Sequence, residues 1–201
     1  MVHLAIFDYG AGNIFSLKNS LEKTGATVDV ITNFDKPNIY SGLLLPGVGN
    51  FDPAIKSICK SKTNFINYVK DNTPVLGICL GMEMFFEKSE EGNEKGLGVI
   101  NGDVIILPSS MKVPHMGWNN LEIKKSGIIL EGVNDNTWVY FVHSYSVKPT
   151  NNDVITAESD YGIKVPAVVE QGNFFGTQFH PEKSGKVGKI MIQNFLDVCK
   201  K

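Results

Sequence analysis

Short apolar runs alternate with helical patterns through the first part of the chain. The runs are long enough for buried strands and cover residues 2–7, 27–31, 43–45 and 75–78. The intervening segments carry apolar residues at helical spacing and cover residues 16–24, 53–69 and 80–87. Asp52 is a candidate N-cap for the middle helix, with Pro53 at its first position. This alternation predicts a parallel α/β sheet covered by helices on both faces.

The second half of the chain has a different pattern. A polar, glycine-containing stretch at residues 87–98 comes first, and short strand-like segments separated by turn residues follow it. These segments cover residues 99–107, 121–123, 138–143, 154–158, 167–171 and 174–179. A closing helix with one apolar face is predicted for residues 184–199. The pattern predicts an antiparallel extension of the sheet, within a single domain that spans residues 1–201.

Composition narrows the class of protein. The chain has 201 residues, 42% hydrophobic and 20% charged, as expected for one globular domain with a substantial core. The net charge of −2 gives no basic surface for nucleic acid or acidic membranes. All 19 basic residues are lysines, so this chain has no bidentate arginine with which to hold a phosphorylated substrate.

Cysteine usage and the N-terminal residues indicate a compartment. The three cysteines, at 59, 79 and 199, have neither the number nor the spacing of a disulfide framework or a zinc site. Residues 1–12 lack the charged start and apolar core of a signal peptide, and no apolar stretch is long enough to span a membrane. We expect a cytoplasmic protein with reduced thiols, no metal and no cofactor.

The strongest chemical signal is Gly77-Ile-Cys79-Leu-Gly81, between a predicted strand and a predicted helix. This is the spacing of a nucleophile elbow, in which the turn is so tight that only glycine fits two positions before and after the nucleophile. The N-terminus of the following helix favours a thiolate and offers free backbone N–H groups. A buried structural cysteine in a tight turn explains the same pattern, and the motif alone leaves both interpretations open.

A cysteine nucleophile needs a base, and the base needs a group that orients it. His180 and Glu182 follow the 174–179 strand and share one face if the chain is extended. Pro181 disfavours helical geometry at His180. In isolation this stretch also fits a loop that ends a strand. Together with the elbow, the two residues predict a Cys79–His180–Glu182 triad, whereas His3 is assigned to the surface or to packing.

Two glycine-rich loops follow predicted strands. The first, at residues 10–12, suggests a dinucleotide fingerprint, but Phe15 stands where the third glycine belongs, so that fingerprint is incomplete. The second contains Gly47, Val48 and Gly49 and is flexible enough to turn backbone N–H groups toward a ligand, as an oxyanion hole requires. A plain strand-to-helix turn also explains the second loop, and the loop taken alone favours that simpler interpretation.

These residues resemble a known family. Gly-Ile-Cys-Leu-Gly-Met at 77–82 and Phe-His-Pro-Glu at 179–182 are similar to the class I, triad-type glutamine amidotransferases. Four further stretches resemble one branch of that family, the glutaminase subunit of imidazole glycerol phosphate synthase. They lie at residues 8–13, 45–49, 112–119 and 143–145. The resemblance covers nearly the whole chain and implies a flavodoxin-like α/β fold.

The resemblance implies roles for individual residues. Cys79 would attack the side-chain amide of L-glutamine to form a γ-glutamyl thioester, with His180 moving protons and Glu182 orienting it. The oxyanion hole would come from the backbone of Leu80 and of Gly47, Val48 or Gly49. The substrate would be held by Glu83, His143, Ser144 and Tyr145. Ammonia would pass through a channel to a (β/α)8-barrel cyclase in a heterodimer, for histidine biosynthesis. The partner face would include Asn13, Trp118, Tyr140 and Lys183.

Two departures from the family pattern leave the function open. Glu83 stands where many members have a glutamine that contacts the substrate, and Ile14-Phe15 replaces a stretch that often carries arginine. A paralogous subunit that feeds ammonia to a sugar amidination pathway for surface polysaccharide would share the same triad. A regulatory subunit with an idle triad and a cysteine peptidase would also carry these motifs. Trp118 and Tyr140 would also suit core packing, and Lys183 a solvated surface.

Overall fold

The structure is a computed structural model that describes residues 2–10, 14–34, 39–59, 62–70 and 72–200. Its helices are α1 Ile14–Glu22, α2 Phe51–Cys59, α3 Lys62–Lys70, α4 Leu80–Glu83 and α5 Gly185–Val198, with short 3-10 turns at Asn152–Val154 and Pro181–Lys183. Its strands are β1 His3–Phe7, β2 Thr27–Ile31, β3 Gly42–Leu45, β4 Val75–Ile78, β5 Lys88–Ser89, β6 Gly102–Ile106, β7 His115–Asn120, β8 Glu122–Ile123, β9 Trp138–His143, β10 Tyr145–Pro149, β11 Ile155–Asp160, β12 Lys164–Gln171 and β13 Phe174–Thr177. No helix of the described residues is long and apolar enough to cross a bilayer.

The main sheet has eight strands in the order β2-β1-β3-β4-β13-β12-β11-β8. The first five strands are parallel, and β12, β11 and β8 continue the sheet in antiparallel pairing. The predicted α/β class with an antiparallel extension is therefore confirmed. Strands β4 and β13 are far apart in sequence but lie side by side, and Ile78 pairs with Thr177 at their carboxyl ends.

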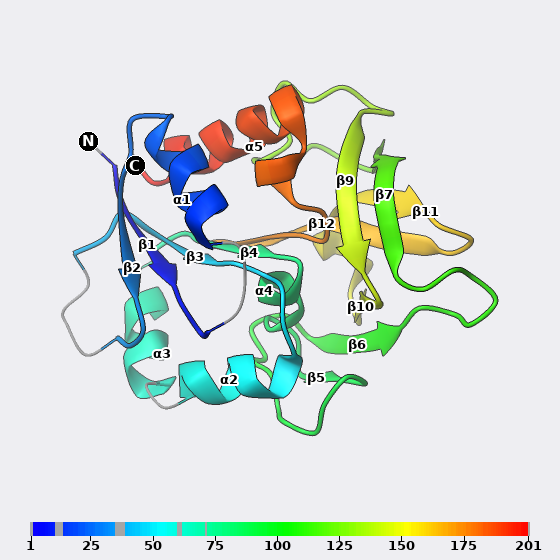
Figure 1. Cartoon of the computed structure of the whole chain (residues 1–201), viewed down its shortest axis with the longest axis horizontal. Helices are drawn as coiled ribbons and strands as arrows, with labels where there is room; N and C mark the ends of the chain where they lie inside the picture. Colours follow the sequence, from blue (N-terminus) through cyan, green and yellow to red (C-terminus); the bar gives the residue numbers. More distant parts are fainter. Residues whose placement is uncertain (1, 11–13, 35–38, 60–61, 71, 201) are drawn as a thin grey trace.

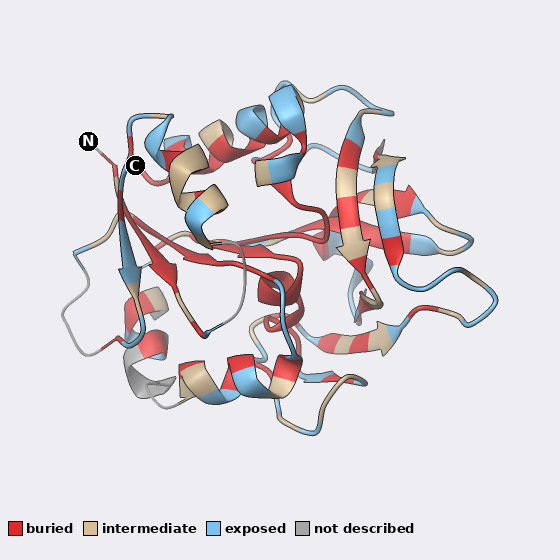
Figure 2. Cartoon of the chain, viewed as in Figure 1, coloured by how far each residue is buried: buried red, intermediate tan, exposed pale blue. Residues whose placement is uncertain are grey.

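Helices cover the main sheet on both faces (Figure 1). Helices α1 and α5 lie on one face, and α2 and α3 lie on the other. Successive residues of β1 alternate between the two resulting cores: Leu4 and Ile6 face α1 and α5, and Ala5 and Phe7 face α2 and α3. Because both faces are covered, the central strands are buried throughout (Figure 2), as their uninterrupted apolar runs predict.

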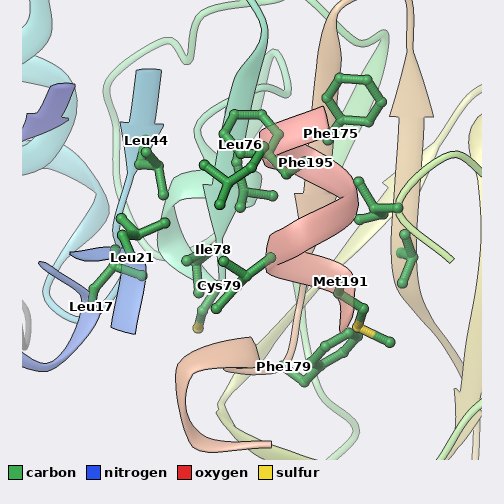
Figure 3. Close-up of a cluster of buried hydrophobic side chains, with 14 of the residues drawn as sticks. Leu17, Leu21, Leu44, Leu76, Ile78, Cys79, Phe175, Phe179, Met191 and Phe195 are labelled. Carbon is green, nitrogen blue, oxygen red and sulfur yellow. The ribbon is translucent and has the colours of Figure 1, made fainter. Parts of the chain in front are cut away.

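The core beneath α1 and α5 reaches the predicted elbow. Leu17 and Leu21 of α1 and Met191 and Phe195 of α5 belong to one cluster with the strand residues beneath them. Figure 3 shows Cys79 at the edge of this cluster, next to Ile78. The backbone that carries the candidate nucleophile is thus held by a packed core rather than by an open loop.

Two smaller sheets stand beside the main one. One has the order β10-β6-β5, and the other is the two-stranded antiparallel ribbon β7-β9. The ribbon has a buried inner face with Phe141 and His143 and an outer face with Trp118 and Trp138 exposed. The sequence did not predict β7 or β10; Gly117 and two asparagines give β7 a low intrinsic strand propensity.

Two predicted helices differ in the structure. The helix predicted for residues 53–69 is divided into α2 and α3, and α4 is a single turn instead of extending to residue 87. Met84, Phe85 and Phe86 are all fully buried; three successive helical side chains point roughly 100° apart, so the chain turns to bring them into the core. Helix α2 starts at Phe51, and Asp52 instead accepts hydrogen bonds from the backbone of residues 93 and 94. The predicted N-cap is therefore wrong.

Candidate active site

The backbone at Cys79 has the conformation predicted for a nucleophile elbow. Its φ of 51° and ψ of −108° lie outside the regions that L-residues favour, and the next residue, Leu80, begins α4. A Cβ atom at Gly77 would lie 2.6 Å from the Gly81 carbonyl, and one at Gly81 would lie 1.9 Å from the Leu45 carbonyl oxygen. Close backbone approach therefore explains both glycines, and the elbow geometry is confirmed.

His180 and Glu182 form a buried pair. His180 Nδ1 lies 2.8 Å from Glu182 Oε1, and both side chains are almost wholly buried. Because the ionised carboxylate only accepts, Nδ1 carries the proton and donates it, which leaves Nε2 as an acceptor. Within the described residues Nε2 has no hydrogen-bond partner. Residues 181–183 form a 3-10 turn instead of the extended chain predicted, but the turn still brings imidazole and carboxylate together.

Strand pairing brings this pair to the elbow. Strands β4 and β13 are adjacent and parallel, so both chains leave the sheet at the same edge. The Cys79 N–H donates to the Thr177 carbonyl oxygen at 2.6 Å, directly before the 178–182 segment. A small cavity lined by both Ile78 and His180 lies there. This edge, at the carboxyl ends of parallel strands, is where α/β sheets bind ligands.

The surroundings of Cys79 favour the protonated thiol. Burial raises its pKa well above the ordinary value, and the Glu83 carboxylate raises it further. The Leu80 N–H and the Gln178 amide lower the pKa, but by less. The Sγ atom lies 3.7 Å from the Val142 carbonyl oxygen, to which the thiol donates. The thiol therefore needs a base to become a nucleophile.

A cavity of about 270 Å³ opens beside Cys79. It is smaller than the pockets that take drug-sized ligands and suits a molecule the size of an amino acid. Its wall contains most of the residues assigned to the site from sequence, together with Glu91, Pro114 and Val142. The lining residues are Val48, Gly49, Cys79, Leu80, Glu83, Glu91, Pro114, Val142, His143, Ser144 and Tyr145.

Two carboxyl groups give the cavity an acidic character. Burial raises the pKa of Glu83 to about 8, and the nearby Glu91 also raises it, whereas a hydrogen bond from Gln178 opposes the shift. Glu91 Oε2 accepts the backbone N–H of Phe51 at 3.1 Å, at the start of α2. The cavity therefore suits a ligand that brings a positive charge.

His143 and His115 are neutral and linked to each other. Burial lowers both of their pKa values to about 4. His143 Nδ1 donates to the Tyr145 carbonyl oxygen at 2.6 Å, so its Nε2 accepts from His115 Nδ1 at 2.9 Å. Both ring nitrogens of His143 are thus occupied inside the protein. His143 lines the cavity and fixes the path of residues 143–145 through its ring.

The glycine-rich loop packs against the elbow. A Cβ atom at Gly47 would lie 1.8 Å from the Ile78 carbonyl oxygen and 2.5 Å from the Leu80 nitrogen. Gly49 has a φ of +138°, and Val48 lines both the cavity beside Cys79 and the small one by His180. The loop and the Leu80 N–H are therefore neighbours, as a shared oxyanion hole requires.

Three of the residues predicted for a partner face lie next to one another, and one of them, Lys183, lines the small cavity. Trp118 is half exposed and contacts Tyr140 edge to face at 6.0 Å, and Lys183 Nζ lies 5.8 Å from the centre of the Tyr140 ring. Because half of its surface is exposed, Trp118 lies outside the core. Asn13 lies outside the described residues. No group of three or more metal-ligating side chains occurs within the described part of the chain.

Three residues of the site had no signal in the sequence that pointed to a role. Glu91 lies in a turn-rich segment with no motif, and Gln178 stands inside the strand-end stretch without a chemical pattern of its own. His115 belongs to no motif, and its partner His143 is 28 positions away, so the two meet through the β7-β9 pairing. An exposed acidic segment does not reveal that one of its carboxylates turns inward.

The fold and the site together define a class of protein. The family model for class-I glutamine amidotransferases matches residues 5–199, so the chain belongs to that family. Within it, the chain is 46% identical over 202 residues to the imidazole glycerol phosphate synthase subunit HisH of Archaeoglobus fulgidus, covering 98% of this chain and 100% of the relative. It is 42% identical over 196 residues to the HisH subunit of Methanocaldococcus jannaschii, covering 97% and 99%.

Solved structures agree with the fold. A glutamine amidotransferase from Thermotoga maritima superposes with a TM-score of 0.67 at 18% identity, covering 98% of this chain and 83% of that one. A chain of the PurLQS structure from the same organism gives a TM-score of 0.77 at 18% identity, covering 98% and 99%. At this identity the likeness concerns the fold alone.

Proposed function

We propose that this chain is the glutaminase subunit of an imidazole glycerol phosphate synthase. The observation that supports it best is the elbow at Cys79 beside the His180–Glu182 pair, at the edge of the acidic cavity of about 270 Å³. The HisH subunits to which the chain is similar over almost its whole length support the choice among amidotransferases. Residues 1–201 would form one catalytic domain, because the cavity is lined by residues from both halves of the chain.

The proposed reaction begins with proton transfer from the thiol. His180 Nε2, an acceptor with no partner among the described residues, takes the proton of Cys79, and Sγ attacks the side-chain amide carbon of glutamine. Backbone N–H groups of Leu80 and of the 47–49 loop stabilise the oxyanion. His180 then gives its proton to the departing nitrogen, and ammonia leaves. A water molecule, deprotonated by His180, hydrolyses the γ-glutamyl thioester to glutamate and restores the thiol.

The proposed substrate pose follows from the charges in the cavity. Glu83 and Glu91 attract the α-ammonium group of glutamine, because they are the carboxyl groups among the described lining residues. Ser144 and Tyr145 lie on the segment that the His143 ring holds in place, and backbone N–H groups there would face the α-carboxylate. The side-chain amide then points to Cys79. In this pose one ammonium group binds two carboxyl groups from different segments, Glu83 at the end of α4 and Glu91 in residues 88–91.

The proposed partner is a (β/α)8-barrel cyclase that docks on the outer face of the β7-β9 ribbon and at Lys183. This face carries exposed Met116, Trp118 and Trp138, and aromatic side chains of this kind anchor interfaces. His180 of the triad and Lys183 of the proposed docking face both line the small cavity, so ammonia would leave the triad through this cavity toward the cyclase.

We also propose a cytoplasmic location, since all three cysteines are free thiols.

The test is release of glutamate from glutamine by the purified chain, alone and with a cyclase subunit and its ribotide ligand. The variant C79A is the blank. We expect weak activity alone and an increase of orders of magnitude with the liganded cyclase. Activity that ignores the cyclase would contradict the assignment to this synthase and point to another ammonia acceptor, such as a sugar amidination system. No activity under any condition would contradict glutaminase function itself.

A further inference from the structure

Gln178 connects the nucleophile to the carboxyl group of the cavity. Its side chain is completely buried. Nε2 donates to Glu83 Oε1 at 3.0 Å and also approaches Cys79 Sγ at 3.8 Å. The backbone N–H of Gln178 donates to the Ala167 carbonyl oxygen at 2.9 Å, so β12 fixes the start of the side chain. The two N–H groups of one amide nitrogen are therefore directed to two buried acids, the Glu83 carboxyl group and the Cys79 thiol.

Each of the two acids, Glu83 and Cys79, opposes the ionisation of the other. Glu83 is the last residue of α4, four positions after Cys79, and the buried carboxylate raises the pKa of the thiol. The other groups that interact electrostatically with Glu83 are Glu91, Tyr9 and Tyr145, which are also acids. The described residues that line the cavity include no lysine, and His143 is neutral because its pKa is lowered to about 4. Two buried like charges so close together oppose each other's ionisation.

The neighbouring catalytic pair does not relieve this competition. Glu182 adds a further negative charge that opposes the thiolate. The N–H groups of Leu80 and Gln178 favour the thiolate, but they are dipoles and carry no net charge. A cation inside the cavity would change the balance, and the cavity of about 270 Å³ has room for one small amino acid. The α-ammonium of such a ligand is the cation that the substrate itself brings.

We propose that Glu83 and Gln178 make formation of the nucleophile depend on the α-ammonium group of the substrate: without the ligand the two acids joined by Gln178 hold at most one negative charge, and a bound ammonium group lets both ionise. This inference rests on the proposed glutaminase function. Glu83 is the charge-sensing residue. Gln178 is a positioning residue that keeps one N–H on the carboxylate and directs the other to the sulfur.

Two consequences distinguish this arrangement from simple binding of the ammonium by a carboxylate. Ligand binding near neutral pH releases a proton from Glu83, because the ammonium stabilises its ionised form. The ligand also increases the thiolate fraction of Cys79 in the alkaline range, although it does not touch the sulfur. An amide that fits the cavity but lacks the ammonium group would therefore lose turnover as well as affinity.

The experiment uses L-norvaline, which has the α-ammonium and α-carboxylate but no amide to react. Pentanoate, which lacks the ammonium, is the matched control ligand. Thiolate absorbance in the ultraviolet is followed against pH in the full chain, with C79A subtracted to remove Cys59, Cys199 and the tyrosines. Calorimetry of norvaline binding in two buffers of different ionisation heat counts the protons released.

We expect norvaline to raise the thiolate fraction about tenfold at a fixed alkaline pH, equivalent to about one pKa unit, and to release a proton near neutral pH. Pentanoate should do neither. In E83Q the thiolate forms more readily in the empty protein, and norvaline should change neither the thiolate nor the proton count. A wild-type response that is absent, or that persists in E83Q, overturns the proposal.

The variant Q178M tests the positioning residue, because methionine has a similar length but no N–H donor. We expect about tenfold less thiolate in the norvaline-loaded protein and a lower kcat for glutamine with KM nearly unchanged. An unaltered thiolate titration in folded Q178M would contradict the role of Gln178. If the wild type hydrolyses glutamine but shows no norvaline response, the gating fails and the glutaminase function stands. If the wild type hydrolyses no glutamine even with the cyclase, the function itself fails.

Discussion

At the scale of single residues, the proposed chemistry depends on a thiol and two histidines whose hydrogen-bond partners differ. The Cys79 thiol keeps its proton because it is buried beside a carboxylate. His180 donates from Nδ1 to Glu182 and leaves Nε2 free to accept. His143 is also neutral, but both of its ring nitrogens are hydrogen-bonded inside the protein. Of the two histidines, only His180 has a free acceptor nitrogen for the proton of Cys79.

The first prediction concerns Glu182. In E182Q the side-chain amide can no longer stabilise the imidazolium that forms when His180 takes the thiol proton. We expect kcat for glutamine hydrolysis to fall by about 10²–10⁴-fold, the range for triad residues, with KM little changed. The control is E122Q, which removes a surface carboxylate paired with Lys164 and should leave kcat as it is. Steady-state kinetics that show equal losses in both variants would contradict the role.

The second prediction concerns His143 and pH. Its pKa is about 4 in the folded protein against 6.5 ordinarily, so the unfolded chain binds more protons between these values. The stability that the neutral ring contributes is complete above pH 6.5 and is lost as pH falls toward 4. We expect the difference in unfolding free energy between wild type and H143Q to shrink by roughly 3 kcal/mol over this range. Urea unfolding measures it, and a difference independent of pH would contradict the buried neutral state of the ring.

At the scale of elements, the elbow is formed by three segments of the chain whose backbones approach so closely that no side chain fits between them. The end of β4, the start of α4 and the loop after β3 meet at Gly47, Gly77 and Gly81. Each glycine is needed because backbone atoms of a neighbouring segment occupy the place of its Cβ atom. The strained φ at Cys79 is maintained by this packing and by the core of Figure 3.

The third prediction uses this close packing. In G81A the new Cβ atom would lie 1.9 Å from the Leu45 carbonyl oxygen, so β3 and α4 must separate. We expect a loss of stability of about 1–3 kcal/mol and loss of glutaminase activity, because Cys79 and Leu80 move with α4. The matched control is G172A, in the turn before β13, where φ is +59° but no atom lies within 4 Å. It should cost only about 1–2 kcal/mol and keep its activity, as measured by thermal unfolding and glutamate release.

The parallel half of the sheet was predictable because its strands are uninterrupted apolar runs, such as Leu43–Leu45 and Val75–Ile78. The elbow was predictable because steric exclusion leaves a fixed glycine spacing in the sequence. Strand β7 was not, because its residues pack through tertiary pairing with β9 rather than through their own propensity. Glu91 and Gln178 were missed for a related reason: burial and charge coupling, not spacing, give them their roles.

At the scale of the whole molecule, the site is assembled from separate sheets. Cys79 and Gln178 directly follow strands β4 and β13 of the main sheet, and the β7-β9 ribbon supplies the cavity wall at His143. The Cys79 thiol donates to the carbonyl of Val142, a residue of β9, so the ribbon touches both the nucleophile and, through its outer face, the proposed partner. Movement of the ribbon on docking would therefore reach the thiol directly.

The fourth prediction follows from this arrangement. Trp118 lies on the outer face of the ribbon and is half exposed. We expect W118A to leave glutaminase activity without the cyclase unchanged and to weaken binding of the cyclase by at least about 1–2 kcal/mol, together with its stimulation. The control is I128A, an equally exposed hydrophobic residue beyond the edge strand β8. Equal effects of both variants in a titration with the cyclase would contradict the proposed docking face.

The central claim is that Cys79 attacks glutamine, and the most direct test is to identify the attacking atom. The chain, with the liganded cyclase, is quenched with acid during turnover of glutamine, and its peptides are mapped by mass spectrometry. We expect a single γ-glutamyl thioester on Cys79, absent from C79S and increased in amount when hydrolysis is slowed. Turnover without an adduct on any cysteine, or with the adduct on Cys59 or Cys199, would contradict that claim.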